Sequence, residues 1–241
     1  MKTIVFADVH GMNLWKKVLA FEKKYDKVVF LGDYFDPYYM VYASKMYENF
    51  EEILKLKKKM KDKCILLIGN HDYHYMYNAP GTVRYSRKTQ DLYGAKLSEL
   101  YTNGTMVFAH RQDNILFTHA GVSKYWLEEI AGLSEDDFTP ADLNKLDLSL
   151  YNFNLYTDIF DTYGNSKSQS PIWIRPNALL DKSITRFTQI VGHTRMRAII
   201  NKDNIWFTDS SEFDNYLIIE DGNIIPKTLK REKKNVQNIT K

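Results

Sequence analysis

Residue types that bind metal ions recur in short clusters along this chain, and each cluster follows a run of apolar residues. The clusters supply Asp8, His10, Asp33, Asn70, His119 and His193. Short apolar runs that end in such residues are typical of buried strands, which present polar side chains at their carboxyl ends. Carboxylate, amide and imidazole groups gathered from several strands are what a two-metal hydrolytic site requires. The sequence therefore predicts such a site at one edge of a sheet.

The spacing within the clusters suggests separate tasks for the ligands. Asp8 and His10 are two residues apart, so at a strand end both point to the same side and can chelate one cation. Asp33 follows a glycine that lets backbone and ion approach closely, and it is the candidate for a carboxylate shared by two ions. Asn70 offers a neutral oxygen. Mixed oxygen and nitrogen ligation favours Mn²⁺, iron, Zn²⁺ or Co²⁺ over Ca²⁺ or Mg²⁺.

Strands and helices alternate in the first part of the chain. Strands are predicted at residues 2–7, 28–31 and 64–68, and helices at 11–24 and 39–60. This βαβαβ order is typical of a parallel sheet with crossover helices. Because the carboxyl ends of parallel strands meet at one edge, the order brings the first three clusters together.

The rest of the chain is less regular. Antiparallel strands are predicted at residues 105–109 and 115–118, joined by a turn at 111–114. Further strands are predicted at 187–191, 205–208 and 216–219, with a hairpin into 223–225, and helices at 88–101 and 122–131. Residues 164–170 are predicted to be a mobile loop. We interpret residues 1–226 as one domain with an irregular insertion near 122–186, followed by a basic, disordered tail at 227–241.

Composition and charge narrow the functional class. The chain has 241 residues, 44% hydrophobic and 26% charged, as in ordinary globular proteins. A net charge of +3 is too small to indicate nucleic-acid binding, for which the basic tail is the only support. The single cysteine, Cys64, lies in an apolar run, which favours a buried structural residue and a reducing compartment. Because no apolar stretch approaches the roughly 20 residues of a membrane span and no signal peptide precedes the first strand, we expect a cytoplasmic protein without a membrane partner.

Histidine usage supports a site of metal or catalytic type. Four of the six histidines fall within the clusters, namely His10, His71, His119 and His193. Any one alone is better explained as structural, but four histidines beside carboxylates indicate chemistry. His74 and His110 lack such neighbours in the sequence, and structural or surface roles are favoured for both.

The clusters together resemble the motifs of the calcineurin-like metallophosphoesterase family. They read Asp8-x-His10, Gly32-Asp33-x-x-Asp36, Gly69-Asn70-His71-Asp72, His119 and Gly192-His193, in the family's order. The branch that contains Ser/Thr protein phosphatases and symmetrical diadenosine tetraphosphatases is the nearer match. The resemblance implies an α/β fold, a four-layer α/β/β/α sandwich with mixed sheets, and two divalent ions, Mn²⁺ above all, at the sheet edge.

The resemblance also implies a role for each motif residue. Asp8, His10 and Asp33 would hold the first metal ion, and Asp33, Asn70, His119 and His193 the second. A hydroxide that bridges the ions would attack phosphorus. His71 would protonate the leaving oxygen and Asp36 would orient it, which suits an imidazole held by a carboxylate near neutral pH.

The chain departs from the family pattern at two positions. The family often has a phosphate-binding arginine after the second aspartate, but Pro37 follows Asp36 here. Arg175 is the best substitute, because a similar Trp-x-Arg element precedes the Gly-His-Thr motif in bacterial relatives. Arg195 stands where many members have another metal-binding histidine, so the first metal ion would have three protein ligands, and this arginine could also reach phosphate.

The sequence leaves the substrate open. A phosphomonoesterase acting on a phosphoprotein or a nucleotide is favoured, with a phosphodiesterase or dinucleoside polyphosphate hydrolase as the alternative. A non-catalytic binding module on the same fold is a further alternative, although such modules usually lose ligands that this chain keeps. A group of aromatic residues forms either a wall for a base or peptide, or ordinary packing. It consists of Tyr34, Phe35, Tyr38, Tyr39 and Tyr42.

Overall fold

The structure is a computed structural model that describes residues 1–39, 42–77, 84–155 and 160–230. Among these residues, eleven strands form two mixed sheets. The predicted tail lies mostly outside the described residues. Its first two residues, Lys227 and Thr228, belong to the last strand instead, because they pair with Tyr216 and Asn215.

The first sheet has the strand order β11-β10-β1-β2-β3-β4 within the described part of the chain. Its strands are β1 (Lys2–Phe6), β2 (Lys27–Phe30), β3 (Cys64–Leu67), β4 (Met106–Val107), β10 (Asn215–Glu220) and β11 (Asn223–Thr228). The strands β1 to β4 are parallel, whereas β10 and β11 are antiparallel to their neighbours. Helices α1 (Leu14–Glu22) and α2 (Ala43–Met60) connect the first three strands, which confirms the predicted βαβαβ order.

The second sheet has the order β5-β6-β7-β9-β8 among the described residues. Its strands are β5 (Ala109–Gln112), β6 (Ile115–Thr118), β7 (Thr188–Val191), β8 (Ile200–Lys202) and β9 (Ile205–Phe207). The prediction for residues 105–109 was partly wrong. Met106 and Val107 pair with β3 in the first sheet, and the antiparallel partner of β6 begins only at Ala109.

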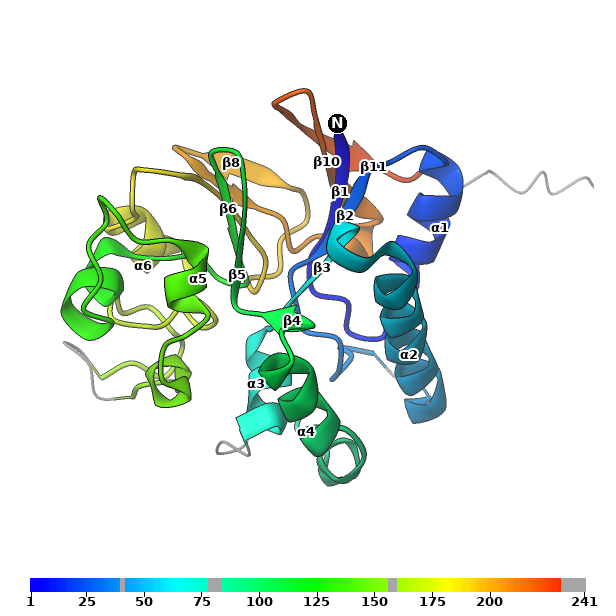
Figure 1. The fold of residues 1–241 in the computed structure, drawn as a ribbon, viewed down its shortest axis with the longest axis horizontal. Helices are drawn as coiled ribbons and strands as arrows, with labels where there is room; N and C mark the ends of the chain where they lie inside the picture. The colour runs from blue at the N-terminus through cyan, green and yellow to red at the C-terminus, as the bar shows by residue number, and fades with distance from the viewer. Residues whose placement is uncertain (40–41, 78–83, 156–159, 231–241) are drawn as a thin grey trace, which may run out of the picture.

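The two sheets pack face to face, and helices cover their outer faces (Figure 1). Val5, Val29 and Leu67 from the first sheet meet Phe117 and Ile190 from the second in one apolar cluster. Helix α2 packs on the outer face of the first sheet through Met46, Phe50 and Ile53, the spacing of one helix face. Helix α6 (Pro176–Asp181) packs on the outer face of the second sheet. The four layers confirm the predicted α/β/β/α sandwich.

Two helices lie below the sheets in Figure 1 and flank the carboxyl ends of the first strands. They are α3 (Asn70–Tyr77) and α4 (Arg87–Thr102). The sequence predicted α4 but missed α3, because α3 is buried on nearly every side and has no apolar stripe to detect. This helix matters because it begins with Asn70 and His71.

The insertion near 122–186 is more ordered than its composition indicated. It contains α5 (Pro140–Leu143), α6 and two short turns of other helix types, η2 (Trp126–Ile130) and η3 (Leu148–Tyr151). The remaining short helices are η1 (Lys61–Lys63) and η4 (Ser211–Phe213). The prediction of a mobile loop at 164–170 was wrong: the Asp161 carboxylate accepts hydrogen bonds from the backbone N–H groups of Tyr163, Gly164 and Ser166. No described helix is long and apolar enough to cross a bilayer.

Candidate metal centre

The six predicted metal ligands converge just beyond the carboxyl ends of five strands. Asp8 and His10 follow β1, and Asp33 follows β2. Asn70 follows β3 as the first residue of α3, while His119 and His193 follow β6 and β7 of the second sheet. All six side chains are buried, each with 5% exposure or less. The candidate site therefore lies where the two sheets meet, and each sheet contributes candidate ligands.

Three glycines allow the loops that carry these residues to touch. A Cβ atom at Gly32 would lie 2.3 Å from the Gly69 nitrogen, and one at Gly69 would lie 2.1 Å from Asp33 Oδ1. At Gly192 it would lie 2.2 Å from Asp8 Oδ2. Any other residue at Gly32 or Gly69 would require a shift of the backbone, and at Gly192 it would require a shift of the Asp8 carboxylate. The glycines before Asp33, Asn70 and His193 are therefore required by the close approach of neighbouring loops.

Five functional candidates have left-handed backbone conformations, which non-glycine residues rarely adopt. They are Asp8 (φ 42°), His10 (φ 42°), Asp33 (φ 54°), Asp36 (φ 58°) and His193 (φ 67°). Such conformations cost energy and persist only where surrounding structure fixes them. Because five such residues lie in one region, we infer that sharp bends after the strands direct these side chains toward the centre.

The donor atoms lie close to one another around Asp33. Its Oδ2 atom is 3.7 Å from His10 Nε2 and 3.5 Å from His119 Nε2. The Asn70 Oδ1 atom is 3.0 Å from His119 Nε2 and 3.0 Å from His193 Nδ1. Donor atoms of Asp8, Asp33 and His119 all lie within 4.8 Å of one another. One carboxylate oxygen thus lies between imidazoles from different sheets.

Each of the three histidines is anchored through one ring nitrogen and presents the other to the site. Backbone carbonyl groups accept from His10 Nδ1 (Phe35, 2.6 Å), His119 Nδ1 (Leu31, 2.8 Å) and His193 Nε2 (Trp173, 3.0 Å). His10 Nε2 is buried and has no hydrogen-bond partner among the described residues. Metal-binding histidines are commonly oriented in this way, by a hydrogen bond from the nitrogen that does not bind the ion.

Electrostatics favours cations at this centre. Burial lowers the pKa of His10 to about 3, and it also lowers the pKa values of His119 and His193, so the three imidazoles are neutral at pH 7. Burial raises the pKa of Asp8 well above its usual value, and the nearby carboxylates of Asp209 and Asp33 raise it further. Burial alone would raise the pKa of Asp33, but attraction to the surrounding histidines in their protonated forms holds it below the ordinary range. Divalent cations would offset the carboxylate repulsion, so the donor set fits metal binding.

The predicted acid pair is formed in the structure. His71 Nδ1 lies 2.8 Å from Asp36 Oδ2, and Tyr75 donates to Asp36 Oδ1 at 2.6 Å. The His71 ring is 5.4 Å from the His10 ring, and its backbone N–H donates to Asp33 Oδ1 at 2.9 Å. The imidazole is therefore fixed beside the metal centre.

Arg84 contacts this acid pair, and sequence reasoning missed it. Its Nη2 atom lies 3.2 Å from His71 Nε2, and its guanidinium carbon lies 3.7 Å above the centre of the Tyr38 ring. A guanidinium can only donate, so His71 Nε2 accepts and Nδ1–H donates to Asp36. Arg84 stands in a polar stretch without apolar periodicity. No signal in the sequence could have placed it here.

Two buried aspartates near the centre were also not assigned a role. The Asp72 carboxylate accepts from the backbone N–H groups of Asp33 (2.7 Å), Tyr34 (2.9 Å) and Gly69 (2.9 Å), which ties two ligand loops together. Asp209 follows β9 and is 4% exposed, and its Oδ2 atom has no hydrogen-bond partner within the described chain. Burial and the Asp33 charge raise the Asp209 pKa to about 7. Asp209 follows an apolar run, so the rule that identified the candidate ligands could have found it.

The two predicted phosphate-binding arginines border the centre, and each has donors engaged by other groups. Arg175 donates through Nη1 to the His193 carbonyl (3.2 Å) and to Thr194 (3.1 Å), and through Nε to the Tyr163 carbonyl (2.9 Å). Arg195 forms an ion pair with Glu212 and donates to the Tyr39 hydroxyl at 3.1 Å. Both positions remain predictions.

The aromatic group divides between the core and the surface. Tyr34 and Phe35 are buried in the core, whereas Tyr38, Tyr39 and Tyr42 are exposed. Any aromatic wall is thus limited to the last three. The remaining candidates have structural surroundings, as expected: Cys64 is a buried free thiol, and His74 packs edge-on against Tyr85 at 4.7 Å.

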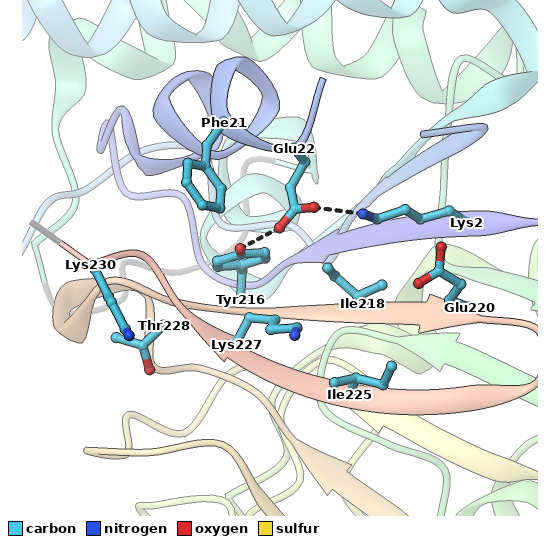
Figure 2. A pocket seen from close by; sticks show the side chains of 10 residues that line it. All are labelled: Lys2, Phe21, Glu22, Tyr216, Ile218, Glu220, Ile225, Lys227, Thr228 and Lys230. Carbon is cyan, nitrogen blue, oxygen red and sulfur yellow. Dashed lines mark hydrogen bonds and ion pairs between the residues drawn. The ribbon is translucent and has the colours of Figure 1, made fainter. Parts of the chain in front are cut away.

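A separate groove of about 600 Å³ lies between α1 and the strands β10 and β11 (Figure 2). None of its lining residues belongs to the metal centre. Within it, Lys2 forms an ion pair with Glu22 at 2.6 Å, and Tyr216 donates to the same carboxylate at 2.5 Å. The candidate metal-binding and catalytic side chains lie elsewhere, at the strand ends.

One known protein is similar to this chain in sequence. The symmetrical bis(5'-nucleosyl)-tetraphosphatase of Aliivibrio salmonicida is 28% identical over 141 residues, which are 54% of this chain and 48% of that protein. The chain thus matches only about half the length of this relative.

Solved structures show the same fold at low sequence identity. A mutant cold-active protein tyrosine phosphatase has a TM-score of 0.59 at 19% identity, covering 93% of this chain and 77% of its own. A protein serine/threonine phosphatase from Saccharomyces cerevisiae has a TM-score of 0.55 at 14% identity, covering 96% and 80%. A metallophosphoesterase from Sphaerobacter thermophilus has a TM-score of 0.52 at 14% identity, covering 95% and 89%. The family model for calcineurin-like phosphoesterases matches residues 1–226, and the chain belongs to that family.

Proposed function

We propose that this protein is a phosphomonoesterase that uses two divalent metal ions. Asp8, His10 and Asp33 would hold one ion, and Asn70, His119 and His193 would hold the other. Asp33 would bind both ions. The observation that carries this proposal is the position of Asp33 Oδ2, which lies 3.7 Å from His10 Nε2 and 3.5 Å from His119 Nε2. A carboxylate between two nitrogen donors from separate sheets is well placed to bridge two cations.

The chain's own residues divide the remaining tasks. When bound, the cations supply Lewis acidity toward phosphoryl oxygen and activate water as a nucleophile. His71 presents Nε2 beside the centre, where this atom accepts from Arg84. Once Nε2 carries a proton in place of that contact, it can pass the proton to the leaving oxygen. Asp36 fixes the imidazole through Nδ1, and Tyr75 fixes Asp36 in turn. Mn²⁺ is the proposed ion, because the donor set mixes oxygen with three imidazole nitrogens.

The substrate proposal has two forms. A monoester in a phosphoprotein or nucleotide is the first, and the similarity in fold to protein phosphatases is compatible with it. A dinucleoside polyphosphate is the second, favoured by the likeness to a symmetrical bis(5'-nucleosyl)-tetraphosphatase. A buried single cysteine is compatible with the proposed cytoplasmic location.

A manganese-supplemented substrate panel tests the proposal. Purified protein would be assayed with p-nitrophenyl phosphate, bis-p-nitrophenyl phosphate and diadenosine tetraphosphate, with EDTA as the control. The proposal expects metal-dependent turnover, fastest on the monoester. Preference for the diester or the tetraphosphate would move the assignment to the alternative. No hydrolysis of any substrate by protein that demonstrably binds Mn²⁺ would indicate a binding module.

A further inference from the structure

The family's usual phosphate clamp is missing from the chain, because Pro37 follows Asp36 and proline has no side-chain donor. A transferred phosphoryl group carries up to two negative charges and requires cationic or bidentate partners. A cationic side chain near the metal centre with free hydrogen-bond donors could take its place.

Among the described residues near the centre, three arginines differ in how far their donors are engaged. Arg175 uses Nε and Nη1 on backbone carbonyls and Thr194, which makes it a support for the loop that carries His193. Arg195 is paired with Glu212, so an acidic neighbour already neutralises its charge. Arg84 has no acidic partner among its described contacts, and its Nε and Nη1 atoms are buried without any hydrogen-bond partner in the described chain.

Arg84 holds its guanidinium group beside His71. Its Nη2 atom lies 3.2 Å from His71 Nε2, the atom that would protonate the leaving oxygen. Its guanidinium plane is supported by Tyr38 at 3.7 Å, and the Tyr38 ring contacts His10 at 4.9 Å. Stacking on an aromatic ring fixes the plane of the guanidinium and leaves its edge available for hydrogen bonds.

The backbone of Arg84 is also unusual, with a left-handed φ of 71°. Left-handed conformations are rare for a residue with a long side chain and require support from the surrounding structure. This conformation occurs in six residues around the centre, Arg84 included. Buried donors without partners carry a desolvation cost, which a bound anion would remove.

We propose that Arg84, stacked on Tyr38, binds the non-bridging oxygens of the substrate phosphate and replaces the arginine that is missing after Asp36. This inference rests on the proposed phosphoesterase function and names its phosphate-binding residue. Tyr38 is then a positioning residue, which acts by fixing the guanidinium plane.

Inorganic phosphate binding to manganese-loaded protein provides the test, measured by isothermal titration calorimetry. Arg84→Gln should weaken phosphate binding roughly 10- to 100-fold, as expected for loss of charge-assisted hydrogen bonds. Arg84→Lys should lose less, because it keeps the charge without the planar fork. The matched control is Arg87→Gln, at an exposed position at the start of α4, which should bind phosphate like the wild type. Mn²⁺ binding should be unchanged in all three variants.

The outcomes separate this inference from the proposed function. Equal phosphate affinity in Arg84→Gln and wild type, or no phosphate binding by the wild type, overturns the role of Arg84 even if the enzyme hydrolyses esters. Loss of Mn²⁺ binding in Arg84→Gln also overturns it, because the residue would then be structural. Phosphate binding that depends on Arg84 supports the role even if no ester on the panel is hydrolysed.

Discussion

Asp72 offers a quantitative test of how the ligand loops are fixed. Its carboxylate accepts three backbone hydrogen bonds, two through Oδ2 from Asp33 and Gly69 and one through Oδ1 from Tyr34. In Asp72→Asn, an amide oxygen can keep the first two bonds. The amide NH₂ group then faces the Tyr34 N–H, and because both groups are hydrogen-bond donors, the buried Tyr34 N–H has no acceptor. Leaving a buried N–H unpaired costs about 1–3 kcal/mol.

A second effect opposes this cost in the metal-free protein. Burial and the neighbouring Asp33 charge raise the pKa of Asp72 well above its usual value, so its charge is unfavourable without cations. Removing the charge relieves that repulsion. We therefore expect Asp72→Asn to destabilise the manganese-loaded protein more than the protein in EDTA. Mn²⁺ affinity should fall roughly 10- to 100-fold, as is typical when a residue that orients metal ligands is lost.

Urea unfolding with Mn²⁺ and with EDTA, together with calorimetric titration of Mn²⁺, measures both effects. Asp91→Asn is the matched control, because Asp91 is exposed on α4 and should change neither quantity. An Asp72→Asn variant that binds Mn²⁺ with wild-type affinity would refute the reasoning, since the ligand loops would then not depend on this carboxylate.

Three further predictions concern other parts of the structure. His71→Ala should bind Mn²⁺ normally but lose roughly 10²–10⁴ in rate on esters with poor leaving groups, and much less on p-nitrophenyl phosphate; equal losses on both would exclude an acid role. Asp33→Asn should lower the affinity for both ions, so manganese analysis by mass spectrometry should find at most one ion per chain, and two retained ions would contradict a shared carboxylate. Burial lowers the His110 pKa to about 4, with Lys27 and Lys57 adding to the shift. Because the unfolded histidine takes up its proton first, stability present above about pH 6.5 is lost as the pH falls toward 4. In EDTA, the free energy of unfolding measured by urea titration should therefore fall by about 2 kcal/mol less in His110→Gln than in the wild type between pH 7 and pH 5. An identical pH dependence of this free energy in both proteins would contradict the lowered His110 pKa.

The sequence predicted the architecture and the convergence of the candidate metal donors because both follow from local rules. Apolar runs identified β1, β2 and β3, and the residue types at their carboxyl ends identified Asp8 and Asp33. Parallel strands must share an edge, so the convergence of these residues required no knowledge of packing. The same rule would have identified Asp209 after β9.

Other parts could not be predicted, because they depend on tertiary contacts. Arg84 has no spacing signal, and its role depends on stacking with Tyr38 and contact with His71. Residues 164–170 have the composition of a loop, but Asp161 orders them through backbone hydrogen bonds. Helix α3 lacks an apolar stripe because the core surrounds it. In each case the missing information is which distant group supplies the partner.

The most direct measurement is anomalous diffraction at the manganese edge from crystals soaked in Mn²⁺. We expect two peaks about 3.5–4 Å apart on either side of Asp33, one next to His10 and the other beside His119. A single peak, or manganese bound only away from these strand ends, would contradict a shared two-ion centre.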